Sequence, residues 1–133
     1  MERNDFLYPE DWFRIGAKEI NRAETLLGSG DLEGAGFNIQ QSLEKYLKGY
    51  LLSKGWKLRR IHRLDIILND VIAYEPSFEE FRKECLKITE YYIEERYPAT
   101  VSSNLTEEEV KNSLYIARKI IDNVLRLKGY CNE

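Results

Sequence analysis

The sequence has little of the chemistry that builds disulfide frameworks or metal centres. Among 133 residues it contains two cysteines, Cys85 and Cys131, and one histidine, His62. The cysteines lie far apart and form no CxxC pair, so they predict no disulfide framework. One histidine with two scattered cysteines also argues against a structural zinc site. We therefore expect no metal, no cofactor, and a reducing, cytoplasmic location.

Long apolar runs and an excess of either charge are also missing. No stretch approaches the ~20 apolar residues that cross a membrane, and residues 1–8 lack the apolar segment of a signal peptide. We therefore expect no membrane contact. Lysine and arginine number 20 against 23 aspartates and glutamates, which gives a net charge of −3. No global positive field attracts nucleic acid, so any anion site must be local.

What the sequence does contain is helical periodicity almost throughout, without the alternation or turn signals of β-hairpins. Asp31 is a good N-cap, and residues 77–80 (Ser-Phe-Glu-Glu) and 106–109 (Thr-Glu-Glu-Glu) both have the form of a capping box. We expect helices over residues 9–27, 31–53, 63–73, 77–96 and 106–128. This pattern predicts an all-α fold, an antiparallel up-and-down four-helix bundle with an additional short helix, about five helices in one domain of residues 1–133.

One arginine does not fit a simple bundle. Arg96 lies four residues after Tyr92 and so extends the core-facing stripe of the fourth predicted helix. A buried arginine needs an acid, and Glu19, on the apolar face of the first predicted helix, is the candidate. The pair is either a structural ion pair or part of a pocket in which Arg96 binds phosphate bidentately. Tyr92 and Tyr97 beside Arg96 either stack a base or belong to the core and its rim.

Two further groups of cations are candidates for phosphate contact. Lys45 and Lys48 share a face of the second predicted helix, which is either solvated or part of a site. The only basic run, residues 57–63, holds Lys57, Arg59, Arg60 and Arg63 around His62. His62 is either a general base or a cap of the third predicted helix. No P-loop, dinucleotide motif, hydrolase elbow or metalloprotease motif is present.

Four segments together resemble the HEPN (higher eukaryotes and prokaryotes nucleotide-binding) family over roughly residues 11–127. They are Trp12 with Glu19 and Ala23, then QQSLEKYLK at 40–48, IHRL at 61–64, and ERYP at 95–98. The resemblance implies a helical bundle that forms a homodimer in a small prokaryotic protein. It also implies a minimal nucleotidyltransferase as partner, in a toxin–antitoxin or accessory pair.

Many members of the family that the sequence resembles are metal-independent ribonucleases. Their motif is an arginine followed, after four to six residues, by a histidine. Arg96 matches the arginine, but Val101, Ser102 and Ser103 stand where the histidine would fall. The resemblance therefore implies nucleotide or RNA binding rather than catalysis. The alternatives are a ribonuclease toxin and a purely structural dimerisation module. In the binding interpretation Arg96 engages phosphate, Tyr92 and Tyr97 shape the pocket, Glu19 orients Arg96, and Lys45, Lys48 and His62 make secondary contacts.

Overall fold

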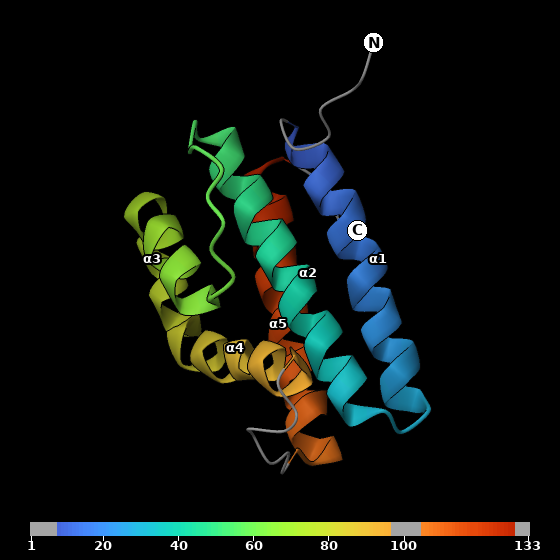
Figure 1. Cartoon of the computed structure of the whole chain (residues 1–133). Helices are drawn as coiled ribbons and strands as arrows, with labels where there is room; N and C mark the ends of the chain where they lie inside the picture. The colour runs from blue at the N-terminus through green and yellow to red at the C-terminus, as the bar shows by residue number, and fades with distance from the viewer. Residues whose placement is uncertain (1–7, 97–104, 130–133) are drawn as a thin grey trace.

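A computed structural model shows that the chain is all-α, as the sequence predicts (Figure 1). It describes residues 8–96 and 105–129, and of residues 92–96 the backbone alone. The elements are α1 (Pro9–Gly28), α2 (Leu32–Ser53), α3 (Leu64–Tyr74), the 3₁₀ helix η2 (Pro76–Phe81), α4 (Arg82–Arg96) and α5 (Glu107–Leu127). Within these described ranges, no helix is both long and apolar enough to span a bilayer.

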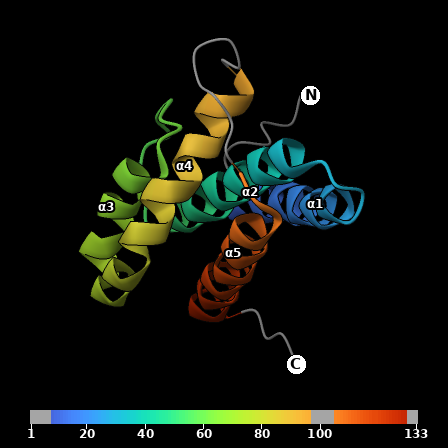
Figure 2. The same cartoon turned by 90° about the horizontal axis from the view of Figure 1, so that it is seen from below.

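Helix α2 is the centre of the arrangement. It forms an antiparallel hairpin with α1, and it also packs against α3, α4 and α5 (Figure 1). Seen along the bundle, α4 crosses α2 obliquely instead of lying beside it (Figure 2). The core combines side chains from all of these helices, among them Ile39, Leu43 and Leu47 of α2, which are fully buried.

Two of the three predicted helix caps are confirmed. The Asp31 carboxylate accepts from the backbone N–H of Gly34 at 2.9 Å. Thr106 and Glu109 form the reciprocal bonds of a capping box at the start of α5. The box predicted at residues 77–80 is wrong. Pro76 starts the 3₁₀ helix one residue earlier and Glu75 is its N-cap, so Ser77 already lies inside the first turn, where its backbone is helical.

The fourth predicted helix, residues 77–96, is also corrected, because its first part is the 3₁₀ helix η2 and α4 begins only at Arg82. The remaining helix boundaries match the predictions or differ from them by one residue. Helix α1 continues through Gly28, α3 begins at Leu64 and ends at Tyr74, and α5 ends at Leu127. At the start of α3 the residue in the N-cap position is Arg63, which makes no side-chain capping bond. Arg63 therefore occupies the N-cap position, which the sequence had left open to His62.

The thiol of Cys85, which lies in the first turn of α4, is fully buried in the core, and burial raises its pKa to about 12. In a Cys131→Ser variant it is the only thiol. We expect a disulfide reagent such as DTNB to leave this variant unlabelled near pH 8 while it is folded, because only an accessible thiolate reacts. In denaturant one thiol per chain should react. Rapid labelling of the folded variant, followed by absorbance, would contradict the described packing.

Candidate functional site

A buried ion pair lies on α2. It is on the helix face for which the sequence left two alternatives, a solvated surface or part of a site. The Nζ of Lys48 lies 2.9 Å from Oε2 of Glu44, one turn away, and the two side chains are only 4% and 5% exposed. The solvated-face alternative is therefore wrong for this pair. A buried charge that loses its partner is strongly destabilising, so each member fixes the other in place.

Glu44 also holds the histidine of the basic run. Its Oε2 lies 3.0 Å from Nδ1 of His62, and its Oε1 accepts from the side-chain amide of Gln40 at 3.2 Å. The same amide donates to the backbone carbonyl of His62 at 2.9 Å. Both the ring and the backbone of His62 are thus anchored to α2. A carboxylate at Nδ1 favours the tautomer with its proton there, which makes Nε2 the basic nitrogen of a ring that is 51% exposed.

The start of α3 is anchored in turn to α4. The backbone N–H of Leu64 donates to Oγ1 of Thr89 at 3.1 Å. The last residue of α4, Arg96, is seven residues beyond Thr89, which corresponds to about 10 Å along a helix axis. The His62 end of the basic run therefore lies close to the part of α4 that leads to Arg96.

The predicted Arg96 pocket is only partly within the described structure. The backbone of Tyr92 and Arg96 belongs to α4, and Tyr97 lies outside the described residues. Glu19 is buried on α1, and Lys45 of α2 donates to both of its oxygens, at 3.1 and 3.3 Å. Burial raises the pKa of Glu19, and the charge of Lys45 opposes this effect. The described partner of Glu19 is thus Lys45, and its pairing with Arg96 stays a prediction.

The basic run lies in the connection between α2 and α3, residues 54–63, which we call the connection. Arg59 pairs with Asp70 of α3 at 3.5 Å, and Arg63 pairs with Asp65 at 3.1 Å. Lys57 and Arg60 are exposed and form no ion pair with any residue that the structure describes. Two of the four cations therefore remain available to an anion, on a backbone that is fixed at His62.

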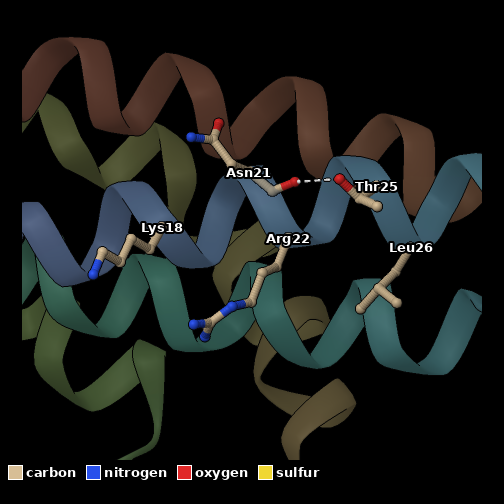
Figure 3. A pocket seen from close by; sticks show the side chains of 5 residues that line it. All are labelled: Lys18, Asn21, Arg22, Thr25 and Leu26. Carbon is tan, nitrogen blue, oxygen red and sulfur yellow. Dashed lines mark hydrogen bonds between the residues drawn. The ribbon is translucent and has the colours of Figure 1, made fainter.

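Another cationic surface, which the sequence analysis missed, lies on α1. Lys18, Asn21, Arg22, Thr25 and Leu26 line an open pocket there (Figure 3). Lys18 and Arg22 extend to one side of α1, while the side chain of Asn21 points to the other (Figure 3). The hydroxyl of Thr25 donates to the backbone carbonyl of Asn21 at 3.2 Å. The i, i+4 spacing of the two cations was the available signal. In the described part of the chain, no group of three or more histidine, cysteine or acidic residues is placed to hold a metal ion.

The comparisons with known proteins agree with this architecture. A model of the HEPN domain family matches residues 9–127. The crystal structure of TT1696 from Thermus thermophilus is similar, with 28% identity and a TM-score of 0.79, and the match covers 89% of this chain and 96% of that one. No curated protein matches the sequence. Because the family model spans nearly the whole chain, the protein belongs to the HEPN family.

Proposed function

We propose that the protein is a nucleotide- or RNA-binding module that recognises phosphate between the connection and the end of α4. The observation that carries this proposal is the anchoring of the connection. Gln40 and Glu44 hold His62 from α2, and Thr89 holds Leu64 from α4. Anchoring fixes the backbone at the His62 end of the basic run before a ligand arrives, which lowers the conformational cost of binding.

The other predicted site residues take indirect roles in this proposal. Lys48 neutralises the buried Glu44, and Lys45 neutralises Glu19, so both act mainly through these acids. Arg60 of the connection, which forms no ion pair with any described residue, offers a guanidinium group that can bind phosphate with two parallel hydrogen bonds. Arg96 would supply the opposing guanidinium, with Tyr92 and Tyr97 shaping the pocket beside it.

Replacing Arg96 by alanine should weaken binding of a fluorescently labelled oligoribonucleotide about tenfold or more, because charge-assisted hydrogen bonds to phosphate contribute about 1.5–3 kcal/mol. Fluorescence anisotropy at a fixed, moderate salt concentration measures the change. Arg126→Ala is the matched control, since Arg126 also lies in the last turn of a helix, α5. Affinity that is equal in both variants would exclude Arg96 from the site. Circular dichroism must show that both remain folded.

We also propose that the module works as a homodimer together with a minimal nucleotidyltransferase. This part of the proposal rests on the family, whose members are often dimeric. Sedimentation of the purified protein at micromolar concentration tests the first statement, and a monomer would contradict it. A small nucleotidyltransferase gene beside this one would support the second.

Metal-independent RNA cleavage is the second candidate, and the His62–Glu44 pair favours it. A carboxylate that orients an imidazole is a common arrangement of a general base. The family motif places its histidine after the arginine, whereas His62 precedes Arg96 in the chain. Incubation of the same labelled RNA, analysed by gel for products that disappear in a His62→Gln variant, separates cleavage from binding alone.

A further inference from the structure

An open pocket of about 390 Å³ lies where the connection leaves α2 and passes the end of α3. It shares Lys57 and Arg59 with the basic run, but His62, Arg60 and Arg96 of the proposed phosphate site do not line it. Its lining residues are Trp56, Lys57, Arg59, Asp70, Ala73 and Tyr74. We propose that this pocket stacks a base of a single-stranded polynucleotide whose phosphates follow the cations of the connection. The inference rests on the proposed function in one respect, because the same strand would reach the phosphate site near His62.

One of the two aromatic side chains of the pocket is held in a fixed position. The indole of Trp56 packs against the core, and its Nε1 donates to Oδ2 of Asp70 at 2.9 Å. Tyr74 is the last residue of α3 and is 47% exposed. Aromatic side chains of this kind stack on bases of any sequence, because every base has a π face. The held indole of Trp56 and the exposed ring of Tyr74 therefore offer two aromatic surfaces on which a base can stack.

The charge around the pocket suits a phosphate rather than a cation. Lys57 and Arg59 line it, and Nζ of Lys54 lies 6.0 Å from the ring centroid of Tyr74. The acid in the lining, Asp70, already accepts from Trp56 and pairs with Arg59. Glu75, next to Tyr74, is the other nearby acid. Because Asp70 is satisfied and Lys57 is not paired within the described residues, an added anion meets an accessible cation.

The course of the connection argues for a strand over a single nucleotide. The backbone N–H of Trp56 donates to the carbonyl of Leu51, while the carbonyl of His62 accepts from Gln40. These two anchor points on α2 are eleven residues apart, which is about 16 Å along a helix axis. The connection covers this distance beside α2 (Figure 1). A mononucleotide can occupy only one end, whereas a short strand can contact both the pocket and the His62 end.

Trp56 itself reports the proposed stacking. The chain has two tryptophans, and the other, Trp12, is buried on α1. We expect single-stranded oligoadenylate of about ten nucleotides to quench Trp56 fluorescence and AMP to bind at least about tenfold more weakly. Tyr74→Ser and Lys57→Gln should each lower the affinity for the oligonucleotide at least about fivefold. Equal quenching by a duplex of the same length would overturn the proposal.

Helix α5 offers matched controls for both substitutions. Tyr115 is 62% exposed there, and Nζ of Lys119 lies 5.7 Å from its ring centroid. This contact resembles that of Lys54 with Tyr74, but neither Tyr115 nor Lys119 lines the pocket. Tyr115→Ser and Lys119→Gln should leave the affinity unchanged. If they weaken binding as much as the pocket variants do, the loss of affinity does not depend on the position of the substituted residue, and the pocket is excluded as the binding site.

The Arg96→Ala variant separates this inference from the proposed function. If Arg96→Ala weakens binding and the pocket variants do not, the result supports the phosphate site and contradicts the stacking pocket. If only the pocket variants weaken binding, the result supports the stacking pocket and excludes Arg96 from the phosphate site. Absence of any binding or quenching by the wild-type protein overturns both.

Discussion

Replacing Glu44 by leucine should lower the free energy of unfolding by about 3–5 kcal/mol, the range seen when one partner of a buried ion pair is removed. The carboxylate is 5% exposed and has three partners, namely Lys48, His62 and Gln40. Leucine is similar in size, so the loss comes from the ammonium of Lys48, which stays buried without a counter-charge. Urea unfolding followed by circular dichroism measures the change as a shift in midpoint at constant slope.

A double variant, Glu44→Leu with Lys48→Met, tests the cause of this loss. Removing both charges together leaves no buried ion, and well-packed apolar replacements of buried pairs are often neutral or stabilising. The double variant should therefore be clearly more stable than Glu44→Leu alone. A double variant that is as unstable as the single one would show that leucine disturbs the packing around α2, and that the buried ammonium is not the cause.

The helices themselves could be predicted from the sequence because their signals are local. The cap of Asp31 and the capping box of Thr106 depend on residues within one turn, and both are present. The capping box predicted at residues 77–80 is absent for an equally local reason. Pro76 is favoured in the first position of a helix and occupies it, so the helix starts before Ser77. Such competition between two start signals is hard to resolve by pattern alone.

The site was harder to predict because its contacts join distant parts of the chain. Helical spacing placed Glu44 and Lys48 on one face of α2, but spacing does not say whether that face is covered. The bond from Gln40 to the carbonyl of His62 spans 22 residues and depends on the path of the connection. The same limit applies to Glu19. The sequence placed this acid on an apolar helix face and made it the candidate partner of Arg96, whereas its described partner is Lys45 of the neighbouring helix.

Replacing Gly49 by alanine should lower the free energy of unfolding by about 1–3 kcal/mol, as overpacking of a tight core does. Gly49 lies where α2 meets α1, and a Cβ there would lie 2.7 Å from Cε1 of Phe13 and 3.1 Å from Cβ of Trp12. The Phe13 ring stacks on Tyr46 with centroids 5.5 Å apart, so it cannot move aside without disturbing that pair. Chemical denaturation of the wild-type and variant proteins measures the difference.

Gly28→Ala is the matched control for this substitution. Gly28 is the last residue of α1, and a Cβ at that position meets no atom within 4 Å. The same change should there be neutral or stabilising by up to about 1 kcal/mol, because alanine has the higher helix propensity. Alanine at Gly49 has that same propensity, so the difference between the two variants isolates the close approach of α1 to α2. Equal stability of the two would mean that the helices can separate at little cost, and α2 would then not be the rigid support on which the anchored connection depends.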